Sequence, residues 1–167
     1  MFVLGIDPGL SRCGYGCISR AGATTRLHAV GVLTTPPSEE LPARLGALQG
    51  DLASLIADLE PDVVAVERLF FQVNVRTAMS VGQASGLVLA AAARAGCEVV
   101  QYTPNAVKQA VAGYGAATKE QVQRMVASLL GLAEPPQPPD AADALALALC
   151  HLAMAPMAAR VQAAVKR

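Results

Sequence analysis

The apolar run Val63–Val66 ends directly in Glu67, and this junction limits what the chain can fold into. A short run without polar alternation, preceded by Pro61, predicts a strand that is buried on both faces inside a sheet covered by helices. A carboxylate at the end of such a strand loses hydration, which is unfavourable by several kcal/mol unless a cation compensates. The sequence therefore predicts an α/β domain with Glu67 at the carboxyl end of an inner strand, where such folds usually place their ligands.

The remaining elements follow an order that is typical of a mixed sheet. Apolar segments bounded by turn residues predict strands over residues 2–6, 13–18, 27–33, 63–66 and 97–102. Periodic leucines and an alanine-rich segment predict helices over residues 41–59 and 77–95. Three more helices are expected to begin near Thr103, Thr118 and Asp140, and Thr118 matches a capping box. Three strands in hairpin order, followed by alternating helices and strands, predict a mixed α/β sheet with helices on both faces.

The composition predicts a single domain. Hydrophobic residues make up 53% of the 167 residues but aromatic residues only 4%, so the core must consist of close-packed aliphatic side chains. We expect one domain over residues 1–155 and a flexible C-terminal tail over residues 156–167. No apolar run reaches the roughly 18–20 residues of a membrane span, and the N-terminus lacks the pattern of a signal peptide. Four cysteines without a CxxC pair are typical of reduced thiols, so we expect a cytoplasmic protein.

Charge is distributed unevenly although the formal net charge is zero. Residues 34–67 carry seven acidic residues and a single base, Arg44, whereas residues 68–119 carry five basic residues and a single acid, Glu98. This asymmetry predicts one face that can meet an anion, with a scatter of charges over a solvated surface as the alternative.

Four carboxylates lie at positions that can converge. Asp7 ends the first apolar strand as Glu67 ends the fourth, so neighbouring strands would bring the two side chains together. Asp140 and Asp143 are three residues apart and share one face of the last helix. Each acid also has a simpler interpretation: a turn residue for Asp7, an N-cap for Asp140, a partner of the helix dipole for Asp143, and an ion pair of Glu67 with Arg68 or Arg76.

Four converging carboxylates would repel one another unless divalent cations bind between them. Oxygen ligands without a Cys/His cluster indicate Mg²⁺ or Mn²⁺ rather than zinc. Two such ions suit hydrolysis of a phosphodiester, because one activates water and the other stabilises the leaving oxygen. Two bound divalent ions would also add four positive charges to the chain, which weakens the objection that a neutral protein does not bind DNA.

Four segments together resemble one known family: LGIDPGLSRCGYG at 4–16, VERLFFQVN at 66–74, VKQAVAGYGAATKEQVQRMV at 107–126 and PDAADALALAL at 139–149. In this order and spacing, over about residues 3–152, the chain resembles the RuvC-type Holliday junction resolvases of bacteria. The resemblance implies a ribonuclease-H-like fold and a homodimer that makes paired symmetric nicks across a four-way DNA junction in recombination and repair. It also implies two Mg²⁺ or Mn²⁺ ions per site and a complex with a branch-migration motor.

The same resemblance implies roles for individual residues. Asp7, Glu67, Asp140 and Asp143 match the family's catalytic carboxylates. Phe70 matches an aromatic residue that stacks on bases near the opened crossover, with core packing as its alternative and the adjacent Phe71 as the other candidate. Lys108 and Lys119 match basic positions that contact phosphate near the scissile strand, with ordinary solvated lysines as the alternative, and Arg76 is a further candidate DNA contact.

Four alternatives concern the assembly and the function. The helix over residues 77–95 is a candidate dimer surface, with burial on the sheet as the alternative. A junction-binding module without catalysis gives no reason to cluster four acids near phosphate. An actin-like phosphotransferase shares the GIDPG loop but needs a second lobe, for which the chain has no room. The fourth alternative is a nuclease of the same fold that cuts RNA–DNA hybrids, which only a comparison of the two substrates distinguishes from a junction resolvase.

Overall fold

The described residues form five strands in a single mixed sheet. The computed structural model describes residues 1–22, 24–68 and 75–165, with residues 75–77 and 156–165 described as backbone only. The strand order is β3-β2-β1-β4-β5. Strands β1 (Phe2–Asp7), β2 (Arg12–Ala21) and β3 (Thr24–Thr34) are antiparallel neighbours, whereas β4 (Val63–Glu67) runs parallel to β1 and β5 (Glu98–Tyr102) parallel to β4. The predicted mixed sheet is confirmed, with β1 at its centre and β4 beside it.

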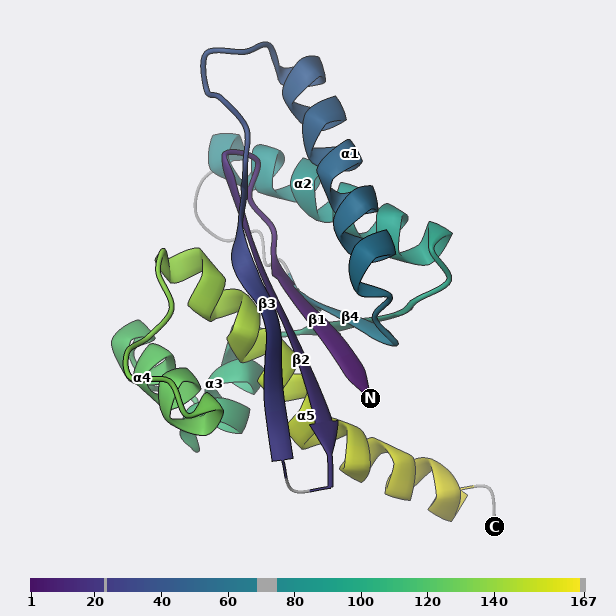
Figure 1. Cartoon of the computed structure of the whole chain (residues 1–167), viewed down its shortest axis with the longest axis vertical. Coiled ribbons are helices and arrows are strands. Elements are labelled where there is room, and N and C mark those ends of the chain that lie inside the picture. Colours follow the sequence, from purple (N-terminus) through teal and green to yellow (C-terminus); the bar gives the residue numbers. More distant parts are fainter. Residues whose placement is uncertain (23, 69–74, 166–167) are drawn as a thin grey trace.

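Helices cover both faces of this sheet (Figure 1). On one face, α1 (Leu41–Leu59) and α2 (Val75–Arg94) enclose a core that includes Leu48, Leu52, Ile56, Ala84, Val88 and Ala92. On the other, α3 (Pro104–Ala112), α4 (Lys119–Leu130) and α5 (Pro139–Val165) enclose a core that includes Val107, Val111, Val122, Val126 and Leu145. Ala84 and Ala92 of α2 are buried in this core, so for them the predicted burial on the sheet applies, whereas Ala90 and Ala93 are exposed.

The alternation of side chains along β1 and β4 decides which face receives the acids. Ile6 and Val66 are paired in register and pack into the core under α1 and α2. Successive residues of a strand point to opposite faces, so Asp7 and Glu67, each one position further along, face the helices α3, α4 and α5. Both carboxylates therefore lie side by side on the same face of the sheet.

Helix α5 packs on β1 and β2 at unusually short range, because glycines face it. A Cβ added to Gly5 would overlap the carbonyl oxygen of Ala144, and one added to Gly14 would overlap the carbonyl oxygen of Asp140. Since Gly14 is the register partner of Asp7, the first turn of α5 lies directly beside the end of β1. The close contact with Gly5 and Gly14 therefore places Asp140 and Asp143 next to Asp7.

The connection between α3 and α4 is fixed by side-chain hydrogen bonds. Thr118 and Gln121 form the predicted capping box at the start of α4. The Tyr114 hydroxyl donates to Gln121 Oε1 at 2.6 Å, and Gln109 Nε2 donates to the Gly113 carbonyl at 2.7 Å. Gly113 ends α3 with φ +85°, a conformation that strongly favours glycine. The two helices that carry Lys108 and Lys119 are thus joined by a well-defined turn.

Several boundaries differ from the sequence-based expectation. Strands β2 and β3 extend three residues further toward their shared hairpin than the predicted strands over residues 13–18 and 27–33. Helix α2 begins at Val75, two residues before the predicted start, and α5 continues through residue 156 to Val165. The flexibility of residues 156–167 and the single-domain boundary at residue 155 stay predictions. None of the helices in the described ranges combines the length and the apolar character needed to span a bilayer.

The packing of α5 predicts the effect of one methyl group. Gly5→Ala should lower the free energy of unfolding by about 3 kcal/mol or more, because backbone atoms of α5 cannot avoid the added Cβ unless the helix shifts. The matched control is Gly46→Ala inside α1, where nothing lies within 4 Å of an added Cβ. There alanine should stabilise by up to about 1 kcal/mol. Urea denaturation followed by circular dichroism measures both, and an unchanged Gly5→Ala variant would contradict the close packing.

Candidate active site

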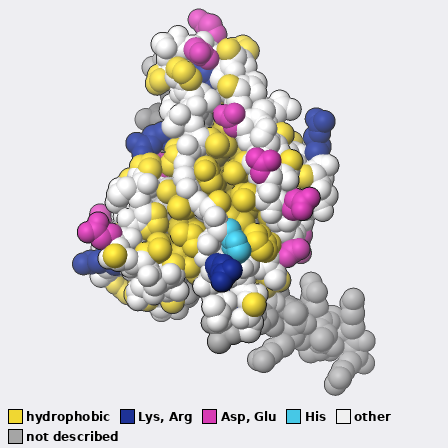
Figure 2. Space-filling model, in the orientation of Figure 1, with side chains coloured by type: hydrophobic (Ala, Val, Ile, Leu, Met, Phe, Trp, Pro, Cys, Tyr) yellow, Lys and Arg dark blue, Asp and Glu magenta, His cyan; other side chains and the backbone are white. Residues whose placement is uncertain are grey.

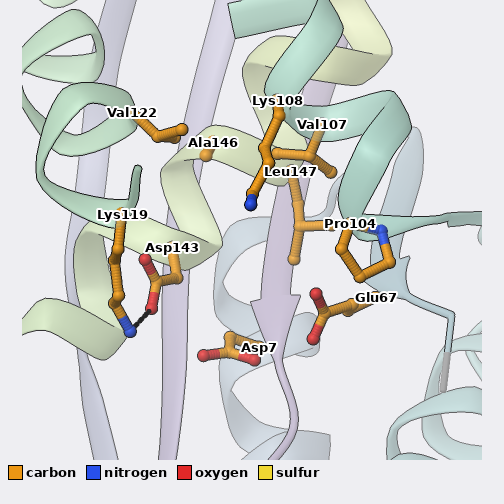
Figure 3. A pocket seen from close by; sticks show the side chains of 10 residues that line it. All are labelled: Asp7, Glu67, Pro104, Val107, Lys108, Lys119, Val122, Asp143, Ala146 and Leu147. Carbon is orange, nitrogen blue, oxygen red and sulfur yellow. Dashed lines mark ion pairs between the residues drawn. The ribbon is translucent and has the colours of Figure 1, made fainter. Parts of the chain in front are cut away.

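A cavity of about 380 Å³ lies at the carboxyl ends of β1 and β4, under helices α3, α4 and α5 (Figure 3). Three of the four predicted carboxylates line it, Asp7, Glu67 and Asp143, together with both predicted lysines, Lys108 and Lys119. Its remaining lining is apolar: Pro104, Val107, Val122, Ala146 and Leu147. Figure 3 shows Asp7 between Asp143 and Glu67, with the Lys108 amine directed toward the same space. The predicted convergence of these acids is therefore observed.

Asp7 is the most perturbed acid of the group. Burial raises its pKa to about 7, and repulsion from Glu67, Asp143 and Asp140 adds to this effect. Burial also raises the pKa of Glu67, with further repulsion from Asp143, while Lys119 opposes the shift. The alternative interpretation of Glu67, an ion pair with Arg68, does not apply, and in the described part of the chain neither Asp7 nor Glu67 has a cationic partner within 4 Å. The two strand-end acids thus form a buried site that attracts cations.

The acids on α5, in contrast, are each paired with a base. Asp143 Oδ2 lies 2.5 Å from Lys119 Nζ, and Asp143 Oδ1 accepts a long hydrogen bond of 3.5 Å from Gln123. Partial burial opposes the charge of Lys119, but its hydrogen bond and attraction to Asp143 outweigh burial and raise its pKa. Asp140 Oδ2 lies 2.9 Å from Nη2 of Arg12, which is the first residue of β2. Asp140 is in the first turn of α5 rather than at its N-cap.

Arg12 and Gln123 are not predicted from the sequence. The signal for Arg12 is that it follows the turn after Asp7 on the strand paired with β1. Two further predicted DNA contacts cannot be placed beside the cavity. Phe70, like Phe71, lies outside the described residues, and Arg76 lies in the first turn of α2, where only the backbone is described.

The charge asymmetry along the sequence maps only in part onto the two faces of the sheet. Acidic side chains follow α1 in Figure 2, on the helix layer that does not contribute to the cavity. Lys108 and Lys119 lie on α3 and α4, in the opposite layer, and both line the cavity. Arg76 and Arg94, however, lie on α2, in the same layer as α1. The predicted anion-binding face therefore stays a prediction, supported by the two lysines at the cavity.

The donor set fits hard divalent cations, but the side chains are not yet arranged around one ion. All four candidate ligands offer carboxylate oxygens, which Mg²⁺ and Mn²⁺ prefer. Within the described ranges, no three Asp, Glu, His or Cys side chains stand close enough together to hold an ion between them. The reason lies on α5, where Asp140 and Asp143 are turned to Arg12 and Lys119.

The comparisons with known proteins agree with this site. Residues 3–151 match the family model described as crossover junction endodeoxyribonuclease RuvC. The chain belongs to this family. A relative of that name from Chloroflexus aggregans is 54% identical over 93% of this chain and 95% of its own length. Another from Salinispora arenicola is 52% identical over 100% of this chain and 96% of its own length.

A solved structure extends the comparison to the fold. T. thermophilus RuvC in complex with a Holliday junction substrate is 42% identical to this chain, with a TM-score of 0.88 over 95% of this chain and 96% of its own. The predicted ribonuclease-H-like fold is confirmed by this match. As a member of the RuvC family, the chain is an endodeoxyribonuclease.

The shifted pKa of Asp7 predicts how stability depends on pH in the metal-free protein. Its pKa is about 7 in the folded chain against 3.8 for an ordinary aspartate, so the folded state holds this proton more tightly than the unfolded state. Between about pH 4 and about pH 7 the unfolded chain is already deprotonated, so the free energy of unfolding falls as pH rises and levels off above about pH 7. Asp7→Asn should remove this decrease and raise stability at about pH 8 by on the order of 4 kcal/mol.

Urea titrations of chelator-treated protein across this pH range measure the slope. Asp58→Asn, on the exposed surface of α1, is the matched control and should keep the slope of the parent protein. A parent protein whose stability is constant from about pH 4 to about pH 7 would show that Asp7 is not held as described.

Proposed function

We propose that this chain resolves four-way DNA junctions by paired symmetric nicks, as a structure-selective, metal-dependent endonuclease of recombination and repair. The observation that carries the proposal is the cavity in which Asp7, Glu67 and Asp143 meet two lysines. Family membership supports cleavage of DNA. The related T. thermophilus protein, solved with a Holliday junction substrate, supports the four-way junction as the substrate.

The proposed catalytic and metal-binding residues are Asp7, Glu67, Asp140 and Asp143. Two Mg²⁺ or Mn²⁺ ions held by them would supply an activated water and stabilise the leaving 3′ oxygen. Support comes from the all-oxygen donor set and from the raised pKa values of Asp7 and Glu67, which report burial of the two carboxyls and repulsion among the acids, both of which a bound cation would relieve. Cleavage at the 3′ oxygen leaves a 5′-phosphate and a 3′-hydroxyl, ends that a ligase can join.

The chain's own residues bind and orient the substrate in this proposal. Lys108 and Lys119 bind phosphates of the scissile strand, since both line the cavity and Lys108 is directed into it. The apolar wall of Val107, Val122 and Leu147 limits access of bulk water to the acids. Phe70 stacks on an unpaired base, worth ~1–3 kcal/mol, and Arg76 contacts the DNA backbone. These last two assignments rest on the motif alone.

The assembly follows from the geometry of the substrate. Two cuts on opposite strands require two sites, so we propose that the chain acts as a homodimer. Within α2, Met79 is 61% exposed and is a candidate contact of that dimer. Action on chromosomal junctions also supports a cytoplasmic location and a complex with a branch-migration motor.

Substitution of the strand-end acids tests the chemistry. Asp7→Asn and Glu67→Gln should each lower the rate of junction nicking by more than about 100-fold, because loss of a direct ligand exceeds the effect of losing a residue that merely supports one. Nicking should stop when a chelator is added and return with Mg²⁺ or Mn²⁺. The assay is a denaturing gel of an end-labelled four-way junction.

Asp51→Asn on the exposed face of α1 is the matched control and should cleave at the parent rate. Circular dichroism shows whether each variant is folded. Near-normal nicking by folded Asp7→Asn would refute the proposed chemistry.

Comparison of substrates tests the specificity. A four-way junction should be nicked in preference to an RNA–DNA hybrid duplex of the same sequence, as measured by the ratio of kcat/KM for the two substrates. Faster cleavage of the hybrid would assign the chain to a different nuclease activity on the same fold.

A further inference from the structure

Arg12 is a basic residue of the site to which the proposed function gives no role. Its guanidinium contacts Asp140 at 2.9 Å and makes no other hydrogen bond in the described part of the chain. The Arg12 side chain is 50% exposed, and that of Asp140 is 29% exposed. The pair therefore sits at the rim of the site, where one face of the guanidinium is open to solvent.

We propose that Arg12 is a displaceable counter-ion of Asp140: it holds the carboxylate in the metal-free site and passes to a phosphate of the bound DNA once Asp140 becomes a metal ligand. The inference rests on the proposed function, in which Asp140 is a ligand. It adds that occupation of the metal site changes how the protein contacts DNA.

The exchange at Asp140 follows from the charges. An ion pair between half-exposed side chains contributes little, typically below about a factor of five in an equilibrium constant. A divalent ion carries twice the charge of a guanidinium and can approach a carboxylate oxygen to about 2.0–2.2 Å. The ion therefore replaces Arg12 at Asp140, and the Arg12–Asp140 ion pair is the only polar contact of the Arg12 side chain among the described residues that has to break.

The backbone that carries Arg12 is held in place by its neighbours. Arg44 Nη2 donates to the Ser11 hydroxyl at 2.6 Å, and Arg44 Nε donates to the Thr35 hydroxyl at 3.0 Å. Thr35 is buried, and its hydroxyl donates to the Leu10 carbonyl at 2.6 Å. These bonds tie the turn between β1 and β2 to α1. Release from Asp140 therefore moves the Arg12 side chain and leaves its Cα at the rim.

The chemistry of arginine then selects phosphate as the second partner. A guanidinium presents its donors in a planar fork that matches phosphate oxygens and stays charged at all accessible pH values. The scissile phosphate must enter the cavity that Asp7 and Asp143 line. Arg12 lies near that cavity, because it is two residues before Gly14, the register partner of Asp7. A freed Arg12 would therefore contact the scissile strand from the side of β2, whereas Lys108 contacts it from α3.

The experiment compares Arg12→Gln, Arg12→Lys and the parent protein in two measurements. Calorimetric titration with Mn²⁺ in the absence of DNA gives the metal affinity. Fluorescence anisotropy of a labelled four-way junction over a series of salt concentrations, with EDTA or with Ca²⁺, gives the slope of log affinity against log salt. Arg26→Gln is the matched control, because Arg26 is exposed on β3 and pairs in register with Ser19 at the other end of the sheet.

Arg12→Gln should bind Mn²⁺ roughly two- to fivefold more tightly than the parent, because a competing cation has been removed. Its salt slope should equal that of the parent in EDTA and be smaller by about 1 in Ca²⁺, since one phosphate contact is lost only when Asp140 is occupied. Arg12→Lys should restore the slope in Ca²⁺. Arg26→Gln should leave the metal affinity unchanged and change the slope equally, if at all, in both buffers.

Equal slopes for Arg12→Gln and the parent in Ca²⁺ would overturn the proposal and leave Arg12 as a fixed partner of Asp140. A slope difference of the same size in EDTA would also overturn it, because Arg12 would then bind DNA without displacement. A parent protein that binds no Mn²⁺ would overturn the proposed metal site. This result differs from an unchanged slope in Ca²⁺, which would overturn the Arg12 exchange alone. Thermal melts show whether Arg12→Gln is folded. If it is not, a folded Arg12→Lys whose salt slope in Ca²⁺ is smaller than that of the parent decides against the exchange.

Discussion

The close contact between α5 and the strands β1 and β2 is the constraint on which the site depends. Because Gly5 and Gly14 present no side chain, the backbone of α5 lies against the sheet. The first turn of the helix then carries Asp140 and Asp143 to the end of β1, where Asp7 already stands beside Glu67. A helix kept away by one methyl group would separate the acids on α5 from those on the sheet.

The second determinant is negative charge that the protein does not fully neutralise. Asp7 and Glu67 are partly buried without a cationic partner among the described residues, and the pKa of each is raised as a result. Asp140 and Asp143 have partners, but these are long, half-exposed side chains from other elements. The strand-end acids thus attract cations when they are ionised, while the helix acids are held by contacts that can be exchanged.

Much of this arrangement could be predicted from the sequence. The apolar runs before Asp7 and Glu67 identify the strands, and their parallel pairing then brings the two acids together. Asp143 follows from its spacing on a helix. Arg12 and Gln123 could not be predicted in the same way, because their contacts depend on the distance between β2, α4 and α5 rather than on any periodic pattern. The alternative pairing of Glu67 with Arg68 does not occur, because adjacency in the chain does not bring two side chains together at the end of a strand.

The turn that joins α3 to α4 has a consequence for the shape of the bound nucleic acid. Hydrogen bonds from Tyr114 and Gln109, with the left-handed Gly113 between them, lock the two helices into one unit. The backbone positions of Lys108 and Lys119 are therefore set relative to each other before any ligand binds, although their long side chains can still move. In the proposed function, two phosphates of a bound strand would have to match that fixed separation for both lysines to contact them.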